Sequence, residues 1–326
     1  MRRRVLCFVL LSALLVALFF LSVSLGSLKV TPAALFRGFF VAYDPDVATI
    51  YDLRLPRIVI AMLAGAALAV SGALMQAVMK NPIADPGVIG VSSGAAFTAV
   101  VVTAFAPSLY FFTPVFAFAG GLVAFLLVYG LAWDAGLNPL RLILVGVAVN
   151  AMFAGLSEAF NSAGGGNLAG VAAIVNGNIT MKTWDDAGTL LPYVFVGLAL
   201  AFLLARRCDL LMLEDRTARS LGVDVNRSRL FVSFAAVLLA SGSTAIVGVI
   251  GFLGLIAPHI ARILVGSGHR ALLPFSMLLG AFILLLADTL GRTAFAPYEI
   301  SAGILMAVIG GPFFVFLLKR SGKNYG

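Results

Sequence analysis

Charged residues are scarce in this chain, and cysteine and histidine are scarcer still. Only 11% of the 326 residues are charged, whereas 61% are hydrophobic, and the mean hydropathy is +1.07. A soluble domain carries about 25% charged residues, so the composition excludes an ordinary soluble protein and indicates a polytopic membrane protein. The two cysteines and two histidines are too few and too scattered to predict a metal site or a disulfide.

Motifs for nucleotide binding and metal-dependent hydrolysis are also missing. The phosphate-cradling pattern G-x-x-x-x-G-K-[S/T] does not occur in the sequence, and neither does H-E-x-x-H. We therefore expect this chain to be no enzyme and to bind no cofactor itself. The net charge of +8 does not predict a nucleic-acid partner, because the basic residues lie in short loops between apolar runs.

Long apolar runs dominate what is present, and they predict an all-α membrane domain that covers residues 1–326 with ten spans. The first run is longer than the apolar region of a signal peptide and no A-x-A-like site follows it, so we expect it to be retained. The eighth run is short and glycine-rich, which makes it the weakest candidate for a full crossing. The expected spans are 5–25, 57–79, 87–106, 112–132, 140–161, 188–205, 230–249, 252–266, 272–292 and 302–318.

The basic residues orient these spans. If the N-terminus is cytoplasmic and the spans alternate, 16 of the 22 Lys and Arg residues lie on the cytoplasmic side and 6 lie outside. This split favours a cytoplasmic position for both termini and for segment 213–229. The tetrapeptide GVIG occurs at 87–90 and again at 248–251. This match predicts an inverted repeat of spans 2–5 and 7–10, and a chance similarity is the alternative.

The segment "LEDRTARSLGVDVNRSR", residues 213–229, is the one long polar stretch in the chain. Acidic residues come early in it and basic residues later, which suits a helix dipole, and a glycine stands where such a helix would stop. It is interpreted either as a short cytoplasmic helix that docks on a partner or as a solvated loop. The candidate contacts are Glu214, Asp215, Arg216, Ala218, Arg219, Leu221 and Gly222.

The stretch "KNPIADPGVIGVSSGA", residues 80–95, has two prolines that break the preceding helix, Pro82 and Pro86. Asn81 and Asp85 are expected to cap the helix that follows. The small residues around Gly90 predict a close helix contact, and a corner beside a transport path is the functional alternative.

A second glycine-rich stretch, "GFLGLIAPHIAR", carries Pro258, His259 and Arg262. An isolated histidine there is most often a hydrogen-bonded structural residue, and a proton relay or a ligand is the alternative. An intramembrane hydrolase that pairs a serine with His259 is a remote hypothesis.

Polar side chains also fall inside the expected spans. Asn150, Ser157, Glu158 and Asn161 have helical spacing on the fifth span, and Asp288 lies on the ninth. Such groups are costly in lipid and generally face protein or water, so they predict the border of an aqueous path. They also allow an alternative function, an ion-coupled secondary transporter with Glu158 or Asp288 as its proton site.

Among the arginines expected on the outer side, three lie at span ends, against the general trend. Arg54 and Arg57 flank Pro56 at the entry to the second span, and Arg292 ends the ninth. They could receive an acidic partner surface or simply extend their charges to the membrane interface.

Together, five blocks of sequence resemble one family, the FecCD-type permease subunits of type II ABC importers for iron-siderophores, haem and vitamin B12. The resemblance covers nearly the whole chain and implies a multi-pass protein of the bacterial or archaeal cytoplasmic (inner) membrane. The blocks are 53–96, 138–150, 218–229, 247–270 and 299–318.

The resemblance implies specific partners. Segment 213–229 would dock on a separate ATPase, present in two copies, which uses ATP and Mg²⁺. A substrate-binding protein would meet the outer arginines, and a second permease copy or a paralogue would complete a path lined by spans 5 and 10. The residues implied for the path and its cytoplasmic gate are Asn138, Pro139, Leu140, Asn150, Ser157, Glu158, Asn161 and Met306.

The implied cargo is an iron chelate, with a siderophore expected first and haem or cobalamin as alternatives. This chain departs from the family pattern near the expected path: it has Ser301-Ala302-Gly303 where Pro-x-Gly is usual, and Met306 where threonine is common. These departures bear on the substrate more than on the architecture.

Overall fold

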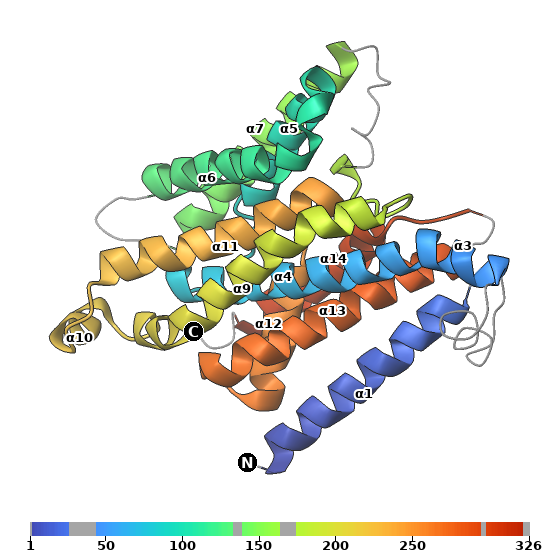
Figure 1. The fold of residues 1–326 in the computed structure, drawn as a ribbon. Coiled ribbons are helices and arrows are strands. Elements are labelled where there is room, and N and C mark those ends of the chain that lie inside the picture. Colours follow the sequence, from blue (N-terminus) through green and yellow to red (C-terminus); the bar gives the residue numbers. More distant parts are fainter. Residues whose placement is uncertain (1, 26–43, 133–138, 164–173, 295–297, 322–326) are drawn as a thin grey trace.

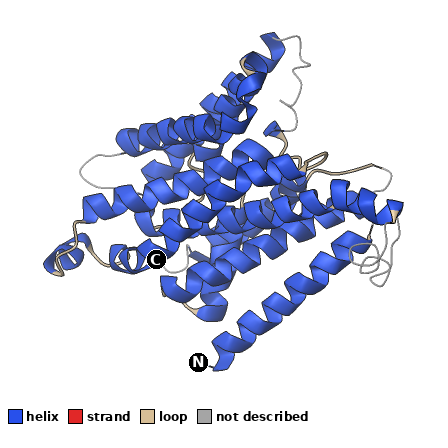
Figure 2. Ribbon diagram, in the orientation of Figure 1, coloured by secondary structure: helices blue, strands red, loops and turns tan. Residues whose placement is uncertain are grey.

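The computed structural model describes residues 2–25, 44–132, 139–163, 174–294 and 298–321, and all regular secondary structure in these ranges is helical (Figures 1 and 2). The helices are α1 (Arg2–Ser24), α3 (Pro45–Leu53), α4 (Leu55–Met79), α5 (Val91–Phe105), η1 (Pro107–Phe112), α6 (Thr113–Ala132), α7 (Pro139–Ala163), α9 (Trp184–Leu211), α10 (Asp215–Ser220), α11 (Val225–Val247), α12 (Leu253–Val265), α13 (His269–Thr293) and α14 (Ala302–Ser321).

Each of the ten predicted spans contains an apolar helix, but the helices are not all long enough to cross a membrane. Among the described residues, seven helical segments have the length and hydropathy of a full span. Helices α5 and α12 have 15 and 13 residues, whereas about 20 are needed to cross 30 Å. The helix expected at 87–106 is shortened because a turn at 86–90 occupies its start, and the eighth run, already the weakest candidate for a full crossing, forms a helix only after an irregular segment at 248–252.

Helix α4 is the central helix of the bundle, and its two ends define the two ends of the molecule. It is almost entirely buried, with α11, α13, α12 and α9 packed around it. Arg57, in its first turn, meets the last turns of α13, whereas Lys80, just after its last turn, meets α10. These residues are about 35 Å apart along the helix. We call the two regions the Arg57 end and the α10 end; α10 and α3 lie at opposite ends of the molecule in Figure 1.

The N-terminal helix places the start of the chain at the α10 end. A Cβ added to Gly266, just after α12, would lie 3.0 Å from Nη2 of Arg4, and α1 finishes beside Arg54 and Arg292 at the Arg57 end. The start of the chain and segment 213–229 therefore share one side of the bundle, which is the relation that the basic residues predict.

Two sets of helices make matching contacts, although the predicted internal repeat stays a prediction. Helix α4 packs against α12 and α13, and α11 packs in the same way against α5 and α6. The short second helices also begin alike, because Gly90 (φ 87°) and Phe252 (φ 64°) both hold the left-handed conformation at the N-cap. These shared features are what two related four-helix sets, α4–α7 and α11–α14, would produce.

Glycines allow the backbones around α4 to touch. Gly65 faces Gly280 of α13, and Gly72 faces Gly254 of α12. A Cβ at Gly65, Gly72 or Gly280 would overlap backbone or Cβ atoms of the opposing helix, and one at Gly254 would press on Asp85 and on the backbone of α4 at 3.0–3.1 Å. Small residues that permit such close approach are the usual means of packing membrane helices, because lipid offers little hydrophobic drive for association.

Replacing Gly72 with alanine should therefore destabilise the bundle by about 1–3 kcal/mol, since the added methyl group would overlap the carbonyl of Gly254. Gly130→Ala is the matched control, because a Cβ there meets nothing within 4 Å among the described residues and alanine is the better helix former. Thermal unfolding in detergent measures both. Equal unfolding midpoints for the two variants would contradict the close contact.

Candidate functional site

Helix α10 is a short surface helix whose end is formed by a glycine. Gly222 has φ +79°, its N–H donates to the carbonyl of Arg219 (2.9 Å), and the N–H of Val223 donates to that of Ala218 (3.1 Å). This is the Schellman pattern that ends helices. This geometry confirms the prediction of a short helix that ends at Gly222.

An ion cluster fixes α10 to the rest of the bundle. Oδ1 of Asp215 lies 2.6 Å from Nζ of Lys80 and 3.0 Å from Nη2 of Arg229. Partial burial alone would raise the pKa of Asp215, but hydrogen bonding to Lys80 and the charges of Arg229, Lys80 and Arg219 outweigh it and hold the pKa below its usual value. Asp215 thus joins α10 to the end of α4 and the start of α11. Neither Lys80 nor Arg229 was among the predicted site residues.

The outward side of α10 is both cationic and apolar. Arg216 and Arg219 are exposed, Leu221 is 61% exposed, and Glu214 is exposed at the N-cap. Ala218 is buried against the bundle. The predicted contact set therefore divides into two groups: Asp215 and Ala218 hold the helix in place, and the exposed residues form a surface that another protein could grip.

Asp85 links the turn after α4 to the second short helix. Its carboxylate accepts the N–H of Gly87 at 2.6 Å, and it also accepts backbone hydrogen bonds from Gly254 and Leu255 in the first turn of α12. Asp85 thus caps α12, a helix distant in sequence. The prediction that Asn81 and Asp85 cap the following helix is wrong: Asn81 accepts from Ile83 inside the turn, and α5 has no side-chain cap at Gly90. Pro82 is exposed and Pro86 is buried in the same turn.

At the Arg57 end, one arginine is buried between two carboxylates. The guanidinium of Arg57 donates from Nε to both carboxylate oxygens of Asp288 at 3.0 Å, and its Nη1 lies 2.8 Å from Oε2 of Glu299. Arg57 is 7% exposed and Asp288 only 1%. Arg57 is therefore not placed to meet an outside partner directly. Asp288 serves as its internal counter-ion, a structural use that differs from the predicted proton site.

The other two outer arginines hold the end of α1. Arg54 donates to the carbonyl of Val23 (3.1 Å), and Arg292 donates to the carbonyls of Ser22 (2.7 Å) and Leu25 (3.1 Å). These carbonyls end a helix and need donors, and a cation there suits the helix dipole. Arg54 and Arg292 remain partly exposed, so their docking role stays a prediction.

The predicted path residues lie on α7 and α14, and they are not equally accessible. Glu158 is exposed, and Asn150 and Asn161 are half-buried. Ser157 is buried and donates to the carbonyl of Phe153, and Met306 is 1% exposed. Asn138 lies outside the described residues, and the side chains of Pro139 and Leu140, at the start of α7, are also outside what the structure describes.

Helix α12 carries the remaining predicted motif residues. Pro258 is buried inside the helix, and the half-buried ring of His259 packs edge-on against Phe313 of α14, with the centroids 5.9 Å apart. Arg262 lies half-buried in the last turn. Over the described residues, no group of three or more His, Cys, Asp or Glu side chains could hold a metal ion. The geometry around His259 supports a packing role.

Sequence comparison relates the chain to transport proteins over nearly its whole length. Residues 14–320 match the model of the FecCD transport family. Among the relatives is a protein of Staphylococcus aureus (strain Newman) described as a probable heme-iron transport system permease protein, IsdF; it is 41% identical over 322 residues, 99% of this chain and 98% of the relative. The corresponding protein of strain MSSA476 is 40% identical with the same coverage.

Solved structures give the same relationship. A metal-chelate type ABC transporter in an inward-facing conformation is 30% identical and superposes with a TM-score of 0.81, over 97% of this chain and 99% of that one. PsaBC from Streptococcus pneumoniae, in complex with Fab, has a TM-score of 0.58 at 16% identity, over 88% of this chain and 95% of that one. The second likeness concerns the fold alone.

Proposed function

This chain belongs to the FecCD transport family, and we propose that it is the membrane permease of an ATP-driven importer, worked through α10 by a separate ATPase. The observation that carries the proposal is the surface of α10. A six-residue helix ended at Gly222 and tied to α4 and α11 through Asp215 presents Arg216, Arg219 and Leu221 outward. A helix anchored in this way can pass a partner's movement into the bundle, because α4 and α11 pack together along the core.

The position of α10 also fits a cytoplasmic ATPase. The chain itself has no phosphate-cradling motif, so the energy must enter from another subunit. The basic residues favour a cytoplasmic α10 end. The Arg57 end then faces outward, where Arg54 and Arg292 are partly exposed and could meet an acidic binding protein.

The transport path is proposed to lie between two permease copies, one of them this chain. Helices α7 and α14 both expose large apolar side chains, including Met152 and Leu156 on α7 and Ile304 and Val308 on α14. A wall of this kind suits a large amphipathic cargo that must bind weakly in order to leave. Glu158 and the half-buried Asn150 and Asn161 lie together on another face of α7 and add polar groups to the same helix.

For the cargo we propose haem-iron, with an iron-siderophore as the competing identity. The sequence alone favoured a siderophore, whereas the 41% identity to a protein described as a probable heme-iron permease favours haem. The metal here is cargo and not a resident cofactor.

Reconstitution into liposomes tests the proposed function. With its ATPase and a loaded binding protein, the permease should accumulate haem only when ATP is present, and the chain alone should accumulate none. Uptake by the chain alone under an ion gradient would overturn the ATPase assignment and favour the secondary transporter. Uptake of an iron-siderophore in place of haem would overturn the cargo assignment alone.

A further inference from the structure

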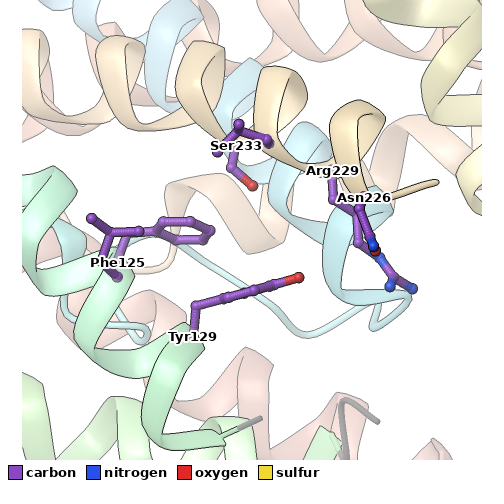
Figure 3. A pocket seen from close by; sticks show the side chains of 7 residues that line it. Phe125, Tyr129, Asn226, Arg229 and Ser233 are labelled. Carbon is purple, nitrogen blue, oxygen red and sulfur yellow. The ribbon is translucent and has the colours of Figure 1, made fainter. Parts of the chain in front are cut away.

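A cavity of about 320 Å³ lies between helices α6 and α11, near the α10 end and away from the proposed path. Figure 3 shows the rings of Phe125 and Tyr129 on one side and Ser233, Arg229 and Asn226 of α11 on the other. Two further apolar residues, Leu126 and Leu230, complete the lining. They are 51% and 58% exposed, so the cavity opens on the flank of the bundle, where lipid would lie.

The cavity is polar toward the end of the bundle and apolar deeper inside. Helix α6 runs toward the α10 end and α11 runs away from it, so Tyr129 and Asn226 lie near the surface, whereas Phe125 and Ser233 lie deeper. Ser233 is eight residues beyond the start of α11, a depth of about 12 Å. The headgroup region of one leaflet is about 5–8 Å thick, so a lipid with its headgroup at the start of α11 would have acyl chains at the level of Ser233.

Buried donors in the lining have no partner among the described residues. Arg229 is 8% exposed and its Nε lacks a hydrogen-bond acceptor there, and the same holds for Oγ of Ser233, which is 1% exposed. A buried donor without an acceptor is costly, most of all when it is charged. Within the described ranges, Arg229 and Lys80 share one carboxylate, that of Asp215. Over these residues the site holds more positive than negative charge.

We propose that this cavity binds one anionic phospholipid of the cytoplasmic leaflet, with its phosphate on Arg229 and an acyl chain along Phe125, Leu126 and Leu230. A phosphate accepts well from a guanidinium, and the hydroxyl of Tyr129, which is hydrogen-bonded to Arg229, closes the polar side. The choice of leaflet rests on the proposed function, whereas the chemistry of the ligand does not.

The lipid would also steady the partner-binding helix. Arg229 holds Asp215 of α10 through Nη2 and is hydrogen-bonded to Tyr129, whereas its buried Nε has no acceptor among the described residues. A phosphate in the cavity would supply that acceptor once the guanidinium turns toward it. The two acceptors therefore use different nitrogens of one guanidinium and need not compete. A lipid that orders the Arg229 side chain would lower the cost of keeping α10 docked.

Native mass spectrometry of the full chain in detergent tests the site. Titration with phosphatidylglycerol should show one tightly bound copy, at least about tenfold tighter than phosphatidylcholine with the same acyl chains. Arg229→Gln should weaken this binding about tenfold or more by removing the charge. Leu126→Trp should weaken it by filling the cavity from its exposed side, independently of α10.

Two matched controls separate this site from general attraction to a basic surface. Arg227→Gln removes an exposed arginine two residues away, and Leu127→Trp enlarges the next residue of α6, which does not line the cavity; both should retain the bound lipid. Equal loss in Arg227→Gln and Arg229→Gln, or equal binding of the two lipids, would overturn the proposal. If millimolar inorganic phosphate displaced the bound phosphatidylglycerol, the site would be a phosphate site and not a lipid site, because the phosphate group alone would then account for the binding. These outcomes do not depend on transport, so they stand apart from a failure of the proposed function.

Discussion

Asp288→Ala should cause the largest loss of stability of any single side-chain truncation at the Arg57 end, about 3–5 kcal/mol. Among the residues that the structure describes, the variant leaves the buried guanidinium of Arg57 with the half-exposed Glu299 as its one remaining counter-ion. A buried charge without its partner keeps the full cost of leaving water, and this cost exceeds the value of the pair itself. The loss should appear as a lower unfolding midpoint in detergent and as less folded protein in the membrane.

A double variant distinguishes an unpaired charge from a packing defect. Arg57→Met with Asp288→Leu removes both charges and keeps apolar volume, so it should recover most of the lost stability. Glu299→Gln is the milder control, because that side chain is 39% exposed and exposed ion pairs contribute about 0–1 kcal/mol. If the double variant were no more stable than Asp288→Ala, the buried charge would not be the cause.

Arg219→Glu should abolish most ATP-dependent uptake, by about tenfold or more, and leave the permease folded. Arg219 is exposed on α10, so the bundle loses no core contact. An acidic partner surface that attracts the arginine would instead face the negative charge of the glutamate. Like charges at an interface cost several kcal/mol. The measurement is the rate of ATP hydrolysis coupled to transport in liposomes that contain the whole complex.

The same charge reversal can be placed outside α10 as a control. Arg227→Glu changes an equally exposed arginine at the start of α11 and should reduce coupled hydrolysis far less. Gly222→Ala provides a second, uncharged perturbation, because φ +79° strains alanine by about 1–2 kcal/mol, although a Cβ there meets nothing within 4 Å among the described residues. Full coupled activity in Arg219→Glu would remove α10 as the point of energy transfer.

Several features could be predicted because they depend on local sequence. An apolar run of the right length becomes a membrane helix wherever it lies, since its backbone must satisfy its own hydrogen bonds in lipid. The short helix in segment 213–229 was predictable for a similar reason: its charges are ordered along the helix and Gly222 can adopt the left-handed conformation that stops it. The five sequence blocks predicted the family, and the match over residues 14–320 confirms it.

The roles of single polar residues could not be read in the same way. Asp85 looked like a cap for the helix that follows it, yet it accepts hydrogen bonds from the start of α12. The shortened start of α5 was not predicted either, because hydropathy does not reveal where a turn such as 81–90 delays the start of a helix, whereas the short eighth run was recognised from its length.

The sequence by itself thus determined the membrane environment, the succession of helices and the one hydrophilic segment fit for a partner. Only the tertiary structure decided that Arg57 is an internal tie and not a docking residue, because its partners Asp288 and Glu299 lie 231 and 242 residues further along the chain. Helix formation is settled by neighbours within a few residues. The pairing of charges depends on which helices pack together. Gly65 and Gly72 allow α13 and α12 to pack closely against α4.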